Sequence, residues 1–251
     1  MLFCDYNSDV LAISQPAHAW ISGQLMRAWA EPLGEPLLLG AEQHDLGWLD
    51  WEAAPTFDPE TGRPHLFRDV GAVTHAPMWV RGLERALAAW GAHVALLISM
   101  HGALIYRRYM DRHRMSEVDA LAAGNYLATQ SEREATWTEV LRLDPAAVRR
   151  ESSLVAFADT LSLALCGGLM APMSLDAPSQ NGDLIRMELT DRAGRPFEFA
   201  LAPSPSSGDT LVVEAEARPL PPSGRFSSEA DMQSWLASPA RETFRAMLFS
   251  A

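Results

Sequence analysis

The apolar residues of this chain recur at helical spacing over most of its first two thirds, which limits the folds it can adopt. Ser14 can cap a first helix, in which apolar residues follow every three or four positions from Ala17 to Ala28. Gly167 and Gly168 are expected to end the last helical segment. Further helices are expected at residues 36–46, 74–91, 92–110, 116–131 and 145–166.

The pattern changes after Met170, where short apolar runs replace the long helical segments. Two of these runs, at residues 184–189 and 197–201, flank a turn-forming stretch, which is typical of a β-hairpin. Residues 211–217 are a candidate for a third strand. A short closing helix is expected from Ser228 to Leu248.

These two patterns define the predicted fold class. We predict a mainly α protein, with a helical bundle at residues 1–170 and a small β-rich C-terminal appendage at residues 171–251 packed on it. A chain of 251 residues can bury a substantial core, so one large domain with an appendage is expected rather than two equal domains. The turn-rich stretch at residues 54–64 is expected to be a loop, and loops of this length often carry function.

Charge and cysteine content exclude several classes of protein. The chain has 32 acidic and 20 basic side chains, a net charge of -12, which disfavours nucleic acid as a partner. Cys4 and Cys166 are too few for a disulfide framework or a cysteine-rich zinc module. No window reaches the roughly 18 apolar residues of a membrane helix, and the first residues do not form a signal peptide. We therefore expect a soluble, cytoplasmic protein that binds a small molecule, with the formation of a homo-oligomer left open.

The adjacent residues His44 and Asp45 are the strongest indication of chemistry in the sequence. Imidazole and carboxylate ligands together suit zinc, manganese or iron, whereas calcium prefers oxygen ligands throughout. A carboxylate has two oxygens and can bridge two cations, which a single imidazole cannot do. The pair therefore indicates a metal site, and its carboxylate allows two ions.

Four further residues on predicted helices are candidate ligands. His18 lies near the start of the first helix, His75 follows the turn-rich loop, and His101 follows a strongly apolar run. Asp159 lies within an apolar helical segment, where an ionised carboxylate is costly without a cation or strong hydrogen bonds. The remaining histidines are assigned to the core or the surface: His65, His93 and His113.

The order of these residues along the chain resembles that of the HD-domain superfamily of metal-dependent enzymes. The segment 43–47, Gln-His-Asp-Leu-Gly, is similar to the His-Asp-x-Gly element of that superfamily, and the resemblance covers about the first two thirds of the chain. The whole chain also resembles a family of uncharacterised bacterial proteins known only as a domain of unknown function. The resemblance implies an HD-like helical metal-binding domain.

The resemblance also implies a role for each candidate ligand. A first metal ion would be held by four residues: His18, His44, Asp45 and Asp159. Asp45 would bridge to a second ion, whose other ligands would be His75 and His101. Two divalent ions are therefore expected, with iron ahead of manganese, zinc, nickel or magnesium.

Two reactions fit such a site, and the sequence leaves both open. In phosphoester hydrolysis, paired metals activate water, Asp45 holds them, and Arg107 or Arg108 contacts the phosphate. In oxidation, two irons use dioxygen to attack a C–H bond of a small polar substrate. Trp48 occupies the place where many HD phosphohydrolases carry a phosphate-binding lysine, which favours oxidation slightly. A non-catalytic protein that binds a metal or a ligand is the third alternative.

Overall fold

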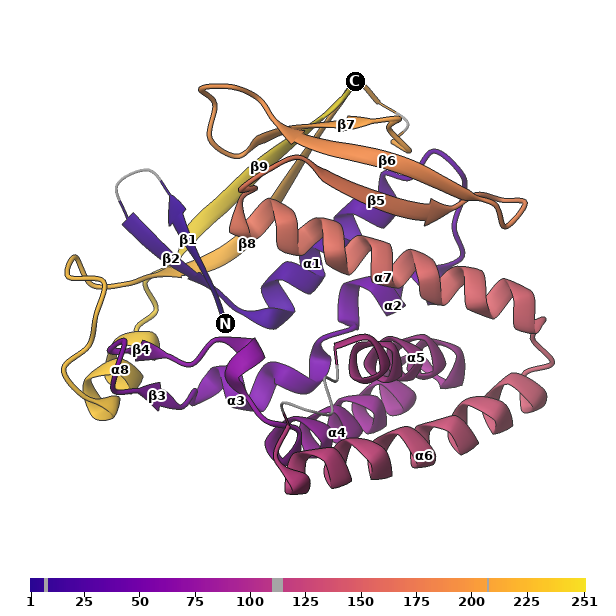
Figure 1. Cartoon of the computed structure of the whole chain (residues 1–251), viewed down its shortest axis with the longest axis horizontal. Coiled ribbons are helices and arrows are strands. Elements are labelled where there is room, and N and C mark those ends of the chain that lie inside the picture. The colour runs from indigo at the N-terminus through magenta and orange to yellow at the C-terminus, as the bar shows by residue number, and fades with distance from the viewer. Residues whose placement is uncertain (7–8, 110–114, 207) are drawn as a thin grey trace.

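The protein consists of a curled sheet, two helices that pack against it, and a further layer of helices (Figure 1). The computed structural model describes residues 1–251 apart from 7–8, 110–114 and 207. Helices α1 and α7 lie between the sheet and the outer helices α2, α4, α5 and α6. In the described part of the chain, no helix is both long and apolar enough to cross a membrane.

The order of the predicted helices is confirmed up to residue 167. Ser14 caps α1, and its side chain accepts a hydrogen bond from the backbone N–H of Ala17 at 3.2 Å. The main difference is α6, which continues to Val140 rather than ending at Ser131. The helices are α1 (Gln15–Arg27), α2 (Glu35–Gln43), α3 (Leu49–Ala53), α4 (Ala72–Trp90), α5 (Ala92–Tyr109), α6 (Glu117–Val140), α7 (Pro145–Gly167) and α8 (Glu229–Leu236). Short 3-10 helices cover Leu46–Trp48 and Phe67–Asp69.

The large sheet has the strand order β1-β2-β8-β9-β7-β6-β5. Neighbouring strands are antiparallel except for β7 and β9, which are parallel. The strands are β1 (Leu2–Tyr6), β2 (Asp9–Ile13), β5 (Met173–Pro178), β6 (Leu184–Asp191), β7 (Glu198–Ala202), β8 (Thr210–Pro219) and β9 (Glu242–Ser250). The predicted hairpin is confirmed as β6–β7, and the third candidate strand is β8. A separate two-stranded sheet, β3 (Phe57–Asp58) and β4 (Arg63–Pro64), lies in the predicted loop.

The predicted mainly α fold class with a small β appendage is wrong. The protein is about 51% helical, but it also has a strand content of 22%, and its seven-stranded sheet draws strands from both ends of the chain. The predicted closing helix is also wrong beyond Leu236, because β9 follows it and pairs with two other strands. Phe244, Ala246 and Leu248 alternate with more exposed residues in β9, which is the period of a strand. The division of the chain at residue 170 stays a prediction.

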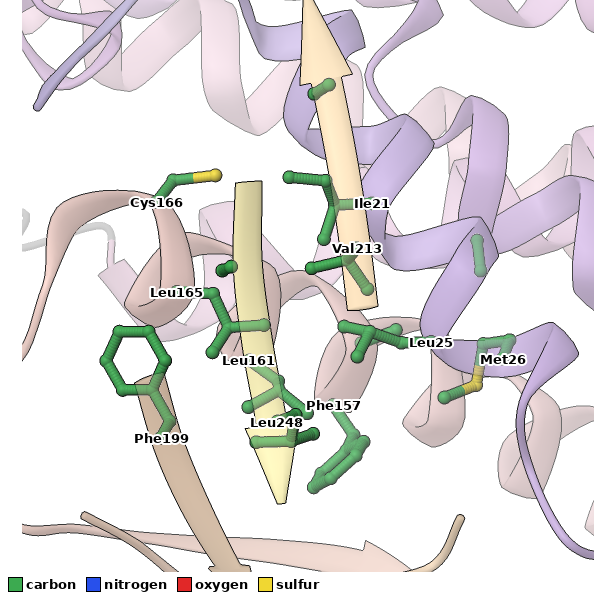
Figure 2. Packing of buried hydrophobic residues seen from close by; sticks show 14 of the residues in the cluster. Ile21, Leu25, Met26, Phe157, Leu161, Leu165, Cys166, Phe199, Val213 and Leu248 are labelled. Atoms are coloured by element: carbon green, nitrogen blue, oxygen red, sulfur yellow. The ribbon is translucent and has the colours of Figure 1, made fainter. Parts of the chain in front are cut away.

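The largest apolar core joins the sheet to α1 and α7 (Figure 2). Ile21 of α1 and Leu161 of α7 are almost fully buried there, together with Phe199 of β7 and Val213 of β8. Burying each such side chain contributes about 1.5–3 kcal/mol. The sheet therefore fixes the two helices that carry His18 and Asp159.

A close backbone contact joins α4 to the segment that follows α2. A Cβ atom on Gly82 of α4 would lie 2.6 Å from the backbone nitrogen of Gly47, so this contact requires glycine. Gly47 belongs to the same short segment as His44 and Asp45. The contact therefore brings α4, which carries His75, directly against the His-Asp pair.

Candidate metal centre

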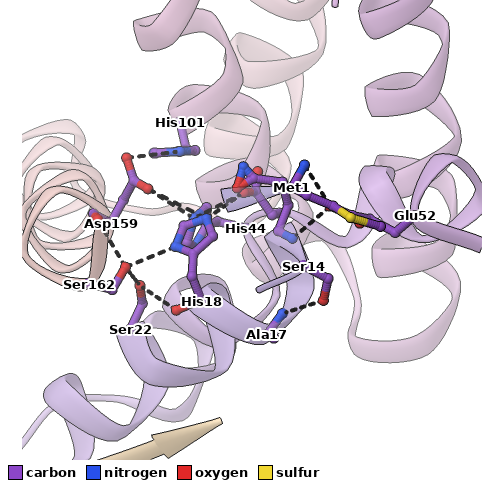
Figure 3. A network of polar contacts seen from close by, with 12 residues as sticks. Met1, Ser14, Ala17, His18, Ser22, His44, Glu52, His101, Asp159 and Ser162 are labelled. Carbon is purple, nitrogen blue, oxygen red and sulfur yellow. Dashed lines mark hydrogen bonds and ion pairs between the residues drawn. The ribbon is translucent and has the colours of Figure 1, made fainter. Parts of the chain in front are cut away.

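Histidines and carboxylates from separate helices converge in the interior of the protein (Figure 3). His44 Nε2 lies 3.3 Å from Asp159 Oδ1, and His101 Nε2 lies 3.8 Å from Asp159 Oδ2. His18 Nε2 lies 2.8 Å from Asp45 Oδ2 and 4.0 Å from Asp159 Oδ1. One ligand atom from each of His18, His44 and Asp159 lies within 4.8 Å of the other two. The structure therefore brings five of the six predicted ligands together.

The sixth predicted ligand, His75, lies beside this group on α4. Among the described residues, no carboxylate oxygen is within 4.0 Å of its ring nitrogens, although the charge of Asp45 acts on it. Its ring packs against Trp48 and Trp79, with centroids 4.8 and 4.4 Å away. His75 Nδ1 is 3.1 Å from the hydroxyl of Tyr106. His75 is thus placed next to the centre without direct contact with its carboxylates.

Hydrogen bonds at the far side of two rings turn their Nε2 atoms toward the carboxylates. His44 Nδ1 is 2.8 Å from the carbonyl oxygen of Ala41, so it carries the proton and donates. His18 Nδ1 is 2.9 Å from Ser162 Oγ, whose own O–H donates to the carbonyl of Asp159. His18 Nδ1 therefore also donates, and its Nε2 lies 2.8 Å from Asp45 Oδ2. A cation must join these two atoms, either a proton on the ring or a metal ion that both atoms ligate.

Several buried nitrogen atoms at the centre have no hydrogen-bond partner among the residues that the structure describes. These atoms are His44 Nε2, His75 Nε2 and both ring nitrogens of His101. An unsatisfied buried polar atom costs about 1–3 kcal/mol, so native proteins rarely leave several together. Metal ligation would use one nitrogen of each ring. The donor set therefore fits the divalent ions that the sequence predicts.

Electrostatics keeps the carboxylates charged and two of the rings neutral. Burial lowers the pKa values of His75 and His101 to about 4. Burial would also lower the pKa of His44, but the charges of Asp45 and Asp159 outweigh it and raise that pKa to about 9. Burial opposes ionisation of Asp159, yet contacts with His44 and His101 hold its pKa well below the usual range. Ionised carboxylates and neutral imidazoles are the forms that bind metals, so a metal ion at this centre would displace the ring proton that His44 holds at neutral pH.

A cavity of about 630 Å³ opens onto the centre. Four of the predicted ligands line it: His18, Asp45, His75 and Asp159. Aromatic side chains form much of the remaining wall: Trp48, Phe67, Trp79 and Tyr106. A cavity of this size accommodates a small molecule directly beside the ligand atoms.

The predicted phosphate contacts do not reach this cavity. Arg107 and Arg108 are exposed on the last turn of α5, and neither is among the described residues that line it. The single arginine or lysine in that lining is Arg68, in the short 3-10 helix before α4. Sequence reasoning missed Arg68 and Tyr106, because neither stands in a motif. The only available signal for Arg68 was its position in the loop region before His75.

The other histidines lie away from the centre where they are described. His65 hydrogen-bonds with Thr56 at 3.0 Å, and His93 with Glu151 at 2.8 Å. His113 lies outside the described residues.

The fold and the centre together define an α-helical and β-sheet protein with a buried His/Asp cluster at the wall of a cavity. The chain belongs to a family described as proteins of unknown function (DUF3891), whose family model matches residues 1–221. The matched region contains all six predicted ligands and every strand of the large sheet except β9. Comparisons with curated proteins and with solved structures find no match.

Proposed function

We propose that this protein is a metal-dependent enzyme of HD-domain type that oxidises a small polar or anionic molecule in its cavity. One observation carries the proposal: buried imidazole nitrogens and carboxylate oxygens face one another at the wall of a 630 Å³ cavity. A purely structural metal site has no need of such a cavity, whereas catalysis needs an open position beside the metal.

The first ion would be held by His18, His44 and Asp159, whose ligand atoms already lie within 4.8 Å of one another, and by Asp45. The second would be held by Asp45 as a bridge and by His75 and His101. Bound iron would supply the redox chemistry with dioxygen that side chains lack.

The protein's own residues would bind and orient the substrate. Trp48, Phe67 and Trp79 form an apolar part of the cavity wall, against which the apolar part of a substrate would pack. Arg68 provides one positive charge for an anionic group of the substrate. Ser162 and the Ala41 carbonyl hold the rings of His18 and His44 in one orientation.

Phosphoester hydrolysis is the second candidate, and Arg68 is the observation that favours it, because a phosphate could bind there. The cavity supports it less well, since Trp48 occupies the place of the phosphate-binding lysine and Arg107 and Arg108 do not line the wall. Oxidation is therefore the better-supported chemistry.

A cytoplasmic location is part of the same proposal. Cys4 and Cys166 are both buried and free, as thiols of a reducing compartment are. Cell fractionation would test it, and recovery outside the cytoplasm would contradict it.

Metal analysis of protein purified without oxygen tests the proposed function. We expect about two iron ions per chain and, after partial oxidation, a mixed-valence spin signal. Zinc, manganese, nickel or magnesium, together with release of p-nitrophenol from a generic phosphodiester, would instead support the hydrolase. The variant His18→Ala should lose metal. The control His93→Ala should retain it, because His93 pairs with Glu151 outside the centre. Protein without metal, and with unchanged stability in chelator, would refute the metal site altogether.

A further inference from the structure

The centre has two halves, one for each proposed ion: His18 and His44 belong to the first, and His75 and His101 belong to the second. The two halves differ in how firmly these histidines are held. In the first half, His18 is fixed by Ser162 and His44 by the carbonyl of Ala41. In the second half, neither nitrogen of His101 has a hydrogen-bond partner among the described residues, and the side-chain hydrogen bond of His75 found there is the one with Tyr106. The first half is therefore preorganised, whereas the second depends on a single hydroxyl.

This hydroxyl occupies Nδ1 of His75, so Nε2 is the nitrogen left for a metal. When Tyr106 Oη, 3.1 Å away, accepts the Nδ1 proton, the lone pair of His75 lies on Nε2, which is buried and has no hydrogen-bond partner among the described residues. Tyr106 comes from α5 and His75 from α4, so the contact also fixes the ring across two helices.

Building on the proposed function, we propose that Tyr106 is the positioning residue of the second metal site, and that the two ions bind in sequence. The ion held by His18, His44 and Asp159 binds first, because their ligand atoms are already close together. The second ion binds more weakly, and the Tyr106 hydroxyl sets its affinity through His75. Loss of a hydrogen bond to a ligating histidine typically weakens metal binding about 10- to 100-fold.

The ring and the hydroxyl of Tyr106 have separable roles. The ring packs against Trp79 and Tyr126, with centroids 5.7 and 5.1 Å away, and phenylalanine would preserve this packing. Tyr126 offers a matched control in the same aromatic cluster, because its buried hydroxyl has no hydrogen-bond partner among the described residues. The variants Tyr106→Phe and Tyr126→Phe thus remove the same atom from neighbouring rings, and only the first removes a contact to His75.

A titration of the metal-free full-length protein with Co²⁺ alone tests the inference. Cobalt absorption reports each binding step, and tryptophan fluorescence reports the second, because Trp48 and Trp79 both pack against His75. We expect two steps in the unmodified protein and in Tyr126→Phe. In Tyr106→Phe the second step should weaken about 10- to 100-fold while the first is unchanged. The variant His75→Gln, which removes the ligand itself, should lose the second step entirely.

Each other outcome has a definite meaning. An unchanged second step in Tyr106→Phe, or a single ion per chain in the unmodified protein, would overturn the inference while leaving a metal enzyme possible. Equal weakening of both steps with a lower melting temperature would show a merely structural role and would also overturn it. No Co²⁺ binding to the unmodified protein would instead refute the proposed function.

Discussion

In the proposed two-metal enzyme, replacing Asp45 with alanine is expected to remove both metal ions and, with them, the proposed activity. Asp45 Oδ2 lies 2.8 Å from His18 Nε2 and 3.7 Å from His44 Nε2, and the same charge acts on His75 on the other side. A bridging carboxylate ligates both ions, so its loss should weaken each binding step by about 100-fold or more, beyond the usual effect of an outer hydrogen bond. Metal content per chain after purification measures the effect.

Asp50 provides the matched control for this experiment. It lies five positions along the chain, but its half-exposed carboxylate pairs with Arg85 at 2.9 Å on the surface. Asp50→Ala should therefore leave the metal content unchanged and have little effect on the free energy of unfolding. Retention of one ion in Asp45→Ala would show that Asp45 is a ligand but not a bridge. Retention of both ions in Asp45→Ala would show that Asp45 is not a metal ligand.

The clustering of these histidines and aspartates could be predicted from the sequence because its signals are local. His44 and Asp45 are adjacent, and Asp159 interrupts an apolar helical segment in which a lone carboxylate would be unstable. Helical periodicity then placed His18 and His101 on separate helices, and the structure brings both rings to one carboxylate, that of Asp159. Such predictions need only the residue types and their spacing.

The sheet could not be predicted in the same way because its pairing is nonlocal. Strand β2 meets β8 through only two residue pairs, Leu11 with Pro219 and Ala12 with Arg218, about two hundred positions apart in the chain. Strand β9 pairs in parallel with β7 and antiparallel with β8, and no local turn indicates either neighbour. The alternation of buried and exposed residues in β9 is a strand signal, but it lies close behind the helical pattern of α8, so the sequence alone favours one continuous helix.

Two residues of the cavity wall, Tyr106 and Arg68, could not be predicted from the sequence for a related reason. Tyr106 and Arg68 carry no motif, and they reach the cavity only because α4, α5 and the segment before α4 meet there. Close packing of these elements is therefore part of the site, and a change in that packing should affect the centre.

Gly102→Ala is expected to destabilise the protein by about 3 kcal/mol or more, because overpacking of a rigid core site lies at the upper end of its usual cost. Gly102 follows His101 on α5, and a Cβ atom there would lie 2.1 Å from the ring of Trp79 and 2.5 Å from the Tyr126 hydroxyl. The Trp79 ring cannot retreat easily, since it already packs against His75, with centroids 4.4 Å apart. The displaced ring should also disturb the second metal site. Urea unfolding of the metal-free protein measures the change in stability.

Gly124→Ala separates this clash from the intrinsic effect of the substitution. Gly124 is an exposed residue of α6, and a Cβ atom there would have no neighbour within 4 Å. Alanine should therefore stabilise α6 by about 0.5–1 kcal/mol, because it has a higher helix propensity than glycine. If Gly102→Ala destabilises the protein and Gly124→Ala stabilises it, the loss of stability comes from the contact between Gly102 and Trp79. Similar small changes in the free energy of unfolding for both variants would mean that Trp79 does not pack on α5 this closely. The arrangement of the cavity wall beside His75 and His101 would then be wrong.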